Sequence, residues 1–126
     1  VHGDAKLANF CFSDSDDSSR FAAVDFQYVG KGVGVKDLAY FLGACLNQDD
    51  LFKHEHLLLD EYFMQLKEAL EHYQVKVDFT HLQQQWRQLY SFAWADFHRF
   101  LSGWSPDHYK INSYMQKQTD IALAHL

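Results

Sequence analysis

Apolar side chains in the second part of the chain, from residue 36 onward, recur every three or four positions. That spacing places them on one face of an α-helix and predicts helices over about residues 37–47, 51–73 and 79–104. In the third of these segments a second apolar strip accompanies the first, so we expect that helix to be buried on two faces and to be central. The two strips consist of Phe79, Leu82, Trp86, Leu89, Ala93, Phe97, Phe100 and Trp104, and of Tyr90, Trp94 and Leu101.

The last helix is predicted from local signals that end one helix and start another. Gly103 is a residue type that helps to end the third helix. Ser105-Pro106 then offers an N-cap followed by a proline in the first helical position. We therefore expect a fourth helix to run from this point towards Leu126.

The first part of the chain, residues 1–35, consists of short apolar runs and polar loops. Phe10-Cys11-Phe12 and Phe21-Ala22-Ala23-Val24 flank a polar turn segment over residues 13–20, a pattern that predicts a β-hairpin. The expected fold class is α+β but mainly helical, with a short hairpin followed by about four helices. We expect residues 1–126 to form a single domain, in which residues 36–126 are the helical subdomain.

Composition and charge narrow the class of protein. The 126 residues are 48% hydrophobic and 22% charged, which is too apolar for a disordered chain. Lys+Arg 11 against Asp+Glu 17 gives a net charge of −6, which argues against nucleic-acid or anionic-membrane partners because both require a basic face. No apolar run approaches the about 20 residues of a membrane span. With only two cysteines, Cys11 and Cys45, a reducing cytoplasmic location is expected.

Polar residues near the start of the chain supply the groups that phosphoryl transfer requires. His2, Asp4, Lys6 and Asn9 lie close together in the sequence, and Asp25 follows at the end of an apolar strand. The reaction needs a carboxylate to deprotonate the attacking hydroxyl, a cation to neutralise the transferred group, and oxygen ligands for Mg²⁺. We predict that Asp4 is the base, that Lys6 faces the phosphate, and that Asn9 and Asp25 hold Mg²⁺ and thereby ATP.

The predicted hairpin provides a way for these residues to meet. Asp4 and Asn9 lie on one loop, and the hairpin then reverses the chain, so that Asp25 returns near Asn9. Mg²⁺ keeps several waters and needs only one or two protein carboxylates. This small set of oxygen ligands is therefore sufficient for a magnesium site.

A resemblance to a known family rests on three segments of this region. They are His2-Gly3-Asp4-Ala5-Lys6-Leu7-Ala8-Asn9, Val24-Asp25-Phe26-Gln27 and Gly34-Val35-Lys36-Asp37-Leu38-Ala39-Tyr40-Phe41-Leu42. The chain resembles the aminoglycoside phosphotransferase and choline kinase group, and within it most closely the choline-kinase-like branch that includes ecdysteroid kinases. The matching motifs cover residues 2–42. The later helices resemble the C-terminal lobe of the group only in being helical, without matching motifs.

The resemblance implies a protein-kinase-like fold of which this chain is the C-terminal lobe. Such enzymes carry an N-terminal lobe with a phosphate-covering loop and an ATP-pairing lysine. The chain begins at the catalytic loop and without an initiator methionine, so we expect a fragment whose partner is the missing lobe of the same protein. We expect this fragment alone to bind Mg-ATP weakly or not at all and to be inactive.

Two residues beside the catalytic ones have supporting roles according to the resemblance. His2 is expected to pack against the loop and to hydrogen-bond it. Asp37 has two compatible interpretations: an N-cap that opens a helix, or a carboxylate that accepts backbone N–H bonds from the catalytic loop and fixes it. Gly30, Gly32 and Gly34 do not complete a phosphate-binding motif, and we interpret them as a flexible or positive-φ segment.

The aromatic residues of the third helix permit two interpretations. Packing in the core is the plainer one, and it leaves open whether these residues also line a pocket; they are Trp86, Tyr90, Trp94, Phe97 and Trp104. The other is an acceptor pocket like that of choline kinases, which this sequence resembles and which bind a quaternary ammonium by cation–π attraction. Asp96 and Arg99 form either an exposed helical ion pair, which we favour, or the polar end of such a pocket.

The expected function is ATP- and Mg²⁺-dependent phosphotransfer to a hydroxyl of a small molecule by the full-length protein. The alternative is a non-catalytic helical binding or interaction module related to kinases. An inactive relative would usually have lost Asp4, Asn9 or Asp25, and all three are present. An amino alcohol, a sugar antibiotic and a sterol are all compatible acceptors.

Overall fold

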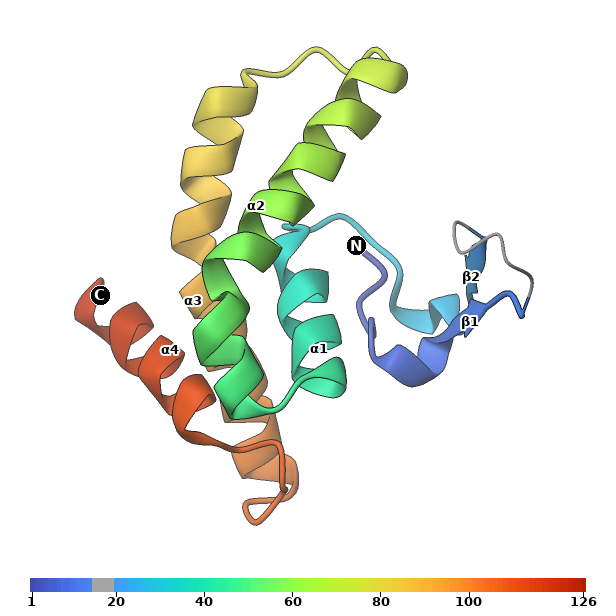
Figure 1. The fold of residues 1–126 in the computed structure, drawn as a ribbon. Coiled ribbons are helices and arrows are strands. Elements are labelled where there is room, and N and C mark those ends of the chain that lie inside the picture. The colour runs from blue at the N-terminus through green and yellow to red at the C-terminus, as the bar shows by residue number, and fades with distance from the viewer. Residues whose placement is uncertain (15–19) are drawn as a thin grey trace.

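The computed structural model describes residues 1–14 and 20–126, and this part of the chain is mainly helical (Figure 1). A short hairpin of β1 and β2 precedes four helices, which confirms the expected α+β, mainly helical class. Short 3₁₀ turns cover Leu7–Asn9 and Phe26–Tyr28. The helices and strands are β1 (Phe10–Phe12), β2 (Phe21–Ala23), α1 (Val35–Cys45), α2 (Gln48–His72), α3 (Phe79–Trp104) and α4 (Ser113–Ala124).

The predicted hairpin is present as a two-stranded antiparallel sheet. Phe10 pairs with Ala23, and Phe12 pairs with Phe21. The polar turn segment predicted over residues 13–20 includes residues 15–19, which lie outside the described residues. Both strands are short and largely exposed, and the hairpin lies to one side of the helices (Figure 1).

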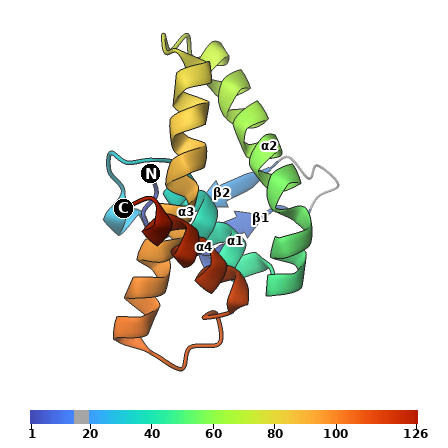
Figure 2. The same cartoon turned by 90° about the vertical axis from the view of Figure 1, so that its left-hand side faces the viewer.

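Helix α3 is the centre of the helical part. It packs against α1 and α4, and α2 lies alongside (Figures 1 and 2). Tyr90, Trp94, Phe97 and Leu101 are all buried, so both predicted apolar strips contribute to the core, although Trp104 at the helix end is 67% exposed. Among the described helices we find none with the length and apolarity needed to cross a membrane.

Side-chain caps begin three of the helices, and one of these starts differs from the prediction. Asn47 accepts a hydrogen bond from the Asp50 amide at 3.0 Å, and Asp78 caps α3 through the His81 amide at 3.1 Å. The predicted start of the fourth helix at Ser105-Pro106 is wrong. Pro106 lies in a turn, and α4 begins at Ser113 after the cap Asn112. Gly103 is the last residue but one of α3, which ends at Trp104 as predicted.

Helix α1 begins at Val35, two residues before Asp37, so the interpretation of Asp37 as an N-cap is wrong. Gly34 occupies the cap position, with a φ of −61°. A Cβ atom at Gly34 would overlap the Tyr62 hydroxyl and lie 2.8 Å from the Trp86 ring. Close packing rather than a positive φ therefore explains this glycine, and the interpretation of residues 30–34 as a positive-φ segment is also wrong.

Candidate active site

The predicted catalytic loop is attached to the first turn of α1 by Asp37. One carboxylate oxygen of Asp37 accepts a hydrogen bond from the His2 amide at 2.5 Å, and the other accepts one from the Gly3 amide at 3.0 Å. These are the backbone bonds expected from the family resemblance. Hydrogen bonds to an ionised carboxylate are stronger than neutral ones, so this half-buried side chain fixes the loop on the helix.

His2 connects the catalytic loop to the segment that contains Asp25. Its Nδ1 accepts a hydrogen bond from the Asp4 amide at 3.3 Å, and its Nε2 lies 2.8 Å from the Val24 carbonyl oxygen. Because Nδ1 accepts, the ring proton is assigned to Nε2, which donates to Val24. The ring also lies 5.1 Å from that of Phe26, centroid to centroid. His2 therefore supports the loop, and both of its nitrogens are engaged by the backbone.

Asp4, Lys6 and Asn9 come together as the sequence predicts. The Asp4 carboxylate lies 3.2 Å from Lys6 Nζ and accepts a hydrogen bond from Asn9 Nδ2 at 3.1 Å. Asn9 Nδ2 also donates to the Asp4 carbonyl at 2.8 Å. Asn9 is 5% exposed, and the Asp4 side chain retains 17% exposure. The carboxylate is thus oriented from the buried side and remains open towards a reactant.

Asp25 returns to the catalytic loop through the hairpin. The amide of its neighbour Val24 donates to the Asn9 carbonyl oxygen at 2.9 Å, which brings the backbone of this segment beside Asn9. Asp25 itself is exposed and has a left-handed backbone, with φ 64° and ψ 60°. That conformation is uncommon outside glycine and is often retained at functional sites.

The oxygen donors of this region suit a magnesium ion. No cluster of three or more His, Cys, Asp or Glu side chains able to hold a metal occurs in the described part of the chain. Asn9 commits its Nδ2 to Asp4, so its carbonyl oxygen is the atom suited to a cation. One carboxylate and one amide oxygen fit Mg²⁺ that shares its remaining positions between water and phosphates. The donor set therefore fits a nucleotide-bound magnesium rather than an all-protein metal cage.

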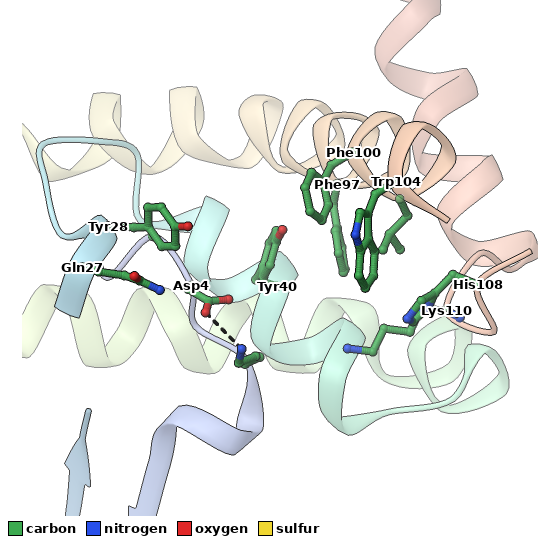
Figure 3. Close-up of a pocket in the computed structure, with 12 residues that line it drawn as sticks. Asp4, Gln27, Tyr28, Tyr40, Phe97, Phe100, Trp104, His108 and Lys110 are labelled. Carbon is green, nitrogen blue, oxygen red and sulfur yellow. Dashed lines mark hydrogen bonds and ion pairs between the residues drawn. The ribbon is translucent and has the colours of Figure 1, made fainter. Parts of the chain in front are cut away.

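A pocket of about 590 Å³ opens beside Asp4 (Figure 3). Gln27 and Tyr28 lie at one end of the pocket. Asp4 and Tyr40 lie between them and an aromatic wall, which consists of Phe97, Phe100 and Trp104 (Figure 3). The lining residues of the pocket come from the catalytic loop, the 3₁₀ turn at Phe26–Tyr28, α1, the end of α3 and the loop that follows, and are Gly3, Asp4, Lys6, Gln27, Tyr28, Tyr40, Phe97, Phe100, Leu101, Trp104, His108 and Lys110.

The aromatic wall answers the question left open for the third helix. Tyr40 stacks on Phe97 with ring centroids 4.1 Å apart, and Phe100 stacks on Trp104 at 6.0 Å. Trp86, Tyr90 and Trp94, in contrast, do not line this pocket and pack in or against the core. The residues of α3 that line the pocket all lie in its C-terminal part; they are Phe97, Phe100, Leu101 and Trp104.

The charged pair on α3 is the exposed ion pair that we favoured. Arg99 donates to Asp96 from Nη2 at 2.8 Å and from Nε at 3.1 Å. Lys36 of α1 adds a longer contact to Asp96 at 3.7 Å. Neither Asp96 nor Arg99 lines the pocket, so the alternative of a polar pocket end is wrong.

Sequence reasoning considered Phe97 and Trp104 for a pocket, and both line it, but it missed most of the other residues beyond the catalytic loop. Tyr40 lies inside the segment that carries the resemblance, but its position gave no sign of a site. His108 and Lys110 belong to the loop that was predicted as the start of a helix. A helix there would have directed these side chains differently. The wrong helix start is therefore the reason why these two residues were not predicted to line the pocket.

The catalytic loop precedes the hairpin and is attached to α1, and the other helices follow. The ecdysteroid kinase-like family model matches residues 1–75, and the chain belongs to this family. The match includes the catalytic loop, the hairpin, α1 and α2, and it leaves α3 and α4 outside. Comparisons with curated proteins and with solved structures give no significant match.

Proposed function

We propose that the protein transfers the γ-phosphoryl group of ATP to a hydroxyl of a small molecule held in the pocket beside Asp4. The observation that carries this proposal is the arrangement of Asp4. Its carboxylate is held by Asn9 and Lys6 and borders a pocket large enough for a small molecule. Membership of a kinase-like family supports the same reaction class.

Each residue of the catalytic loop has a defined part in the proposed reaction. Asp4 accepts the proton of the acceptor hydroxyl and orients its oxygen towards the phosphorus. Lys6 places positive charge beside the transferred group, and Asn9 and Asp25 supply oxygen ligands for Mg²⁺. The magnesium ion, when bound with ATP, neutralises charge on the phosphates. His2 and Asp37 keep the loop in position through the hydrogen bonds described above.

The proposal includes an N-terminal lobe in the same protein and a cytoplasmic location. Orientation alone can supply about 7–11 kcal/mol of catalysis, and in this proposal the N-terminal lobe helps to position the nucleotide. Large apolar side chains near Asp25 are exposed and would suit a covering lobe; they are Phe21, Val24, Phe26, Tyr28 and Val29. We therefore expect the 126-residue chain alone to bind Mg-ATP weakly and to have negligible activity. Free thiols at Cys11 and Cys45 fit the reducing cytoplasm.

The roles of Asp4 and Asp25 can be separated by two substitutions in the full-length protein. Asp4→Asn is expected to lower turnover by at least about 10²–10⁴-fold because it removes a general base. It should leave Mg-ATP binding largely intact, since the base contacts the acceptor. Asp25→Ala should weaken Mg-ATP binding because it removes a metal ligand. Calorimetric titration of Mg-ATP into both variants, with phosphoryl transfer to a panel of hydroxylated metabolites, measures the two effects.

Two outcomes would contradict this assignment. Equal loss of Mg-ATP binding in the two variants would mean that the base and the metal ligand are assigned wrongly. Full-length protein that binds Mg-ATP but transfers phosphate to no acceptor would favour the alternative, a binding module related to kinases.

A further inference from the structure

Lys110 enters the pocket from a segment far from the catalytic loop in the sequence. It belongs to the connection between α3 and α4, and its side chain extends along the pocket towards the side on which Asp4 lies (Figure 3). No carboxylate in residues 1–14 or 20–126 forms an ion pair with it. The Asp4 carboxylate is engaged by Lys6 instead, at 3.2 Å. Among the described residues, Lys110 therefore presents a positive charge to the pocket without a direct ion pair.

The segment that carries Lys110 is held in place by its own backbone. The Ser105 amide donates to the Leu101 carbonyl at 2.7 Å, and the His108 amide donates to the Ser105 carbonyl at 2.9 Å. The Lys110 amide donates to His108 Nδ1 at 3.2 Å. Ile111 follows and packs against the core. The connection thus fixes the base of the lysine side chain at the pocket wall.

The surroundings of Lys110 disfavour its charge. Burial lowers the pKa of Lys110, and the positive charge of Lys6 lowers it further, while Cys45 and Asp4 act in the opposite direction. Tyr40 of α1 and His108 of the same connection also face this pocket. Two ammonium groups thus border one space, and a bound anion would relieve their repulsion.

We propose that Lys110 and Lys6 together bind an oxyanion in the pocket next to Asp4. Two groups in the reaction carry this chemistry: the phosphoryl group in transfer and an acidic group of the acceptor. Identifying the bound oxyanion as one of these two groups rests on the proposed function. The existence of the anion site rests on the two lysines alone. Phosphate and carboxylate oxygens both form charge-assisted hydrogen bonds with ammonium groups.

The same charges argue against a cationic acceptor. Two lysines and one aspartate line the pocket, so these residues carry a net charge of 2 − 1 = +1 when His108 is neutral. A quaternary ammonium would be attracted by the aromatic wall but repelled by this charge. The pocket therefore fits an uncharged or acidic alcohol better than the choline-like acceptor considered from the sequence.

The anion site is testable on the 126-residue chain with inorganic phosphate as the probe. We expect phosphate binding, measured by calorimetry or by NMR titration, to weaken at least about tenfold in Lys110→Met, since a hydrogen bond to a charged group is lost. Lys110→Arg should retain binding. Lys76→Met, at the exposed tip between α2 and α3, removes the same charge far from the pocket and should bind as the unchanged chain does.

The pH dependence of the same titration gives a second readout. Phosphate affinity should fall as the pH rises through the lowered pKa of Lys110, and Lys110→Arg should move this fall to higher pH. Because Lys110→Met removes a partly buried cation that has no ion pair among the described residues, its thermal midpoint should be no lower than that of the unchanged chain. Absence of phosphate binding, or equal binding by Lys110→Met and Lys76→Met, would overturn the proposal.

Assays of the full-length protein distinguish the two sources of the anion. If Lys110 holds the phosphoryl group in transfer, Lys110→Met should lower ATP hydrolysis at least about tenfold in the absence of any acceptor. If it holds an acidic group of the acceptor, hydrolysis should be unchanged, and kcat/KM should fall only for acceptors with a carboxylate or phosphate. No change in either assay would exclude both sources. Absence of all phosphoryl transfer would instead contradict the proposed function. The anion site would then still be judged by the phosphate titration, which does not depend on activity.

Discussion

Gly3, between His2 and Asp4, is the residue whose backbone conformation most constrains the catalytic loop. Its φ is +87°, a region that side chains other than hydrogen rarely permit. A Cβ atom there would overlap the Tyr28 carbonyl oxygen and lie 2.8 Å from the Tyr28 Cβ. Glycine therefore satisfies both a backbone angle and a close approach of the loop to the segment after Asp25.

Replacing this glycine should distort the site. Gly3→Ala is expected to destabilise the fold by at least about 1–2 kcal/mol, the cost of a left-handed conformation, with the overlap against Tyr28 in addition. Gly30→Ala is the matched control, because a Cβ there meets nothing within 4 Å and its φ is not positive. Urea unfolding of both variants measures the difference. Equal midpoints would mean that the loop adjusts without cost.

Individual residues show why only part of the site could be predicted. Asp4, Lys6 and Asn9 are close in sequence, and their residue types alone indicated their chemistry. Asp37 had two interpretations, because a carboxylate near a helix start can cap its own helix or bond another segment. Lys110 carried no local signal, since it joins the pocket only through the packing of α3 on α1.

The predicted helix boundaries were accurate only where the local sequence signals agreed with the burial of the side chains. For α2 and α3 the apolar spacing and the cap residues gave nearly the same limits. Ser105-Pro106 is equally suited to a helix start and to a turn, because proline favours the second position of both. Burial decided in favour of the turn: Tyr114 and Met115 are fully buried, and a helix from residue 113 aligns them with α3.

Buried polar groups connect α2, α3 and α4 across the core. The hydroxyls of Tyr90 and Tyr114 lie 3.2 Å apart. Gln118 donates to the Tyr114 hydroxyl at 3.2 Å and to Glu55 of α2 at 2.7 Å. Such a chain of hydrogen bonds fixes the relative register of the helices, because Tyr90, Tyr114 and Gln118 are buried and would each be unsatisfied if left alone.

Removing the central hydroxyl should destabilise this packing. Tyr114→Phe is expected to lower the free energy of unfolding by about 1–3 kcal/mol, since it leaves the Tyr90 hydroxyl without its partner and costs Gln118 one acceptor. Tyr109→Phe makes the same change at a side chain that is 82% exposed and should have almost no effect. Chemical denaturation of both variants provides the comparison. A loss no greater in Tyr114→Phe than in Tyr109→Phe would show that the hydroxyl chain contributes nothing.

The whole molecule should lose stability in alkali. Burial raises the pKa of Tyr62 to about 12, and the pKa values of Tyr40, Tyr90 and Tyr114 are also raised, chiefly by burial. The unfolded chain releases these protons near the ordinary value of 10.0, before the folded chain does. The contribution of Tyr62 to stability is therefore complete below pH 10 and is lost as the pH rises through about 12, and the other three tyrosines act in the same direction.

Thermal unfolding followed by circular dichroism over this pH range tests the expectation. Tyr62→Phe should reduce the loss of stability, whereas Tyr73→Phe, at a side chain 75% exposed, should not. Comparing variants isolates the tyrosines from Lys110, whose lowered pKa acts in the opposite sense. A midpoint that stays constant to pH 12 would contradict the raised pKa values.

At the scale of the molecule, the fold class and the family were accessible from the sequence because both rest on patterns local to a segment. Periodicity identified α1, α2 and α3, and residues 2–42 contained the family motifs. The relative placement of α1, α3 and α4 was not accessible, because it depends on which aromatic side chains pack against one another. The single-domain organisation and the inactivity of the chain on its own stay predictions.

The attachment of the catalytic loop to Asp37 also has a consequence for biosynthesis. The loop leaves the ribosome before the helix that holds it, because Asp37 follows His2 by 35 residues. Until α1 is made, the amides of His2 and Gly3 can bond only to water or to nearby chain. Contacts that span such a distance form slowly compared with those inside a helix. The nascent chain therefore acquires its catalytic geometry late, as a product of helix assembly rather than as a nucleus for it.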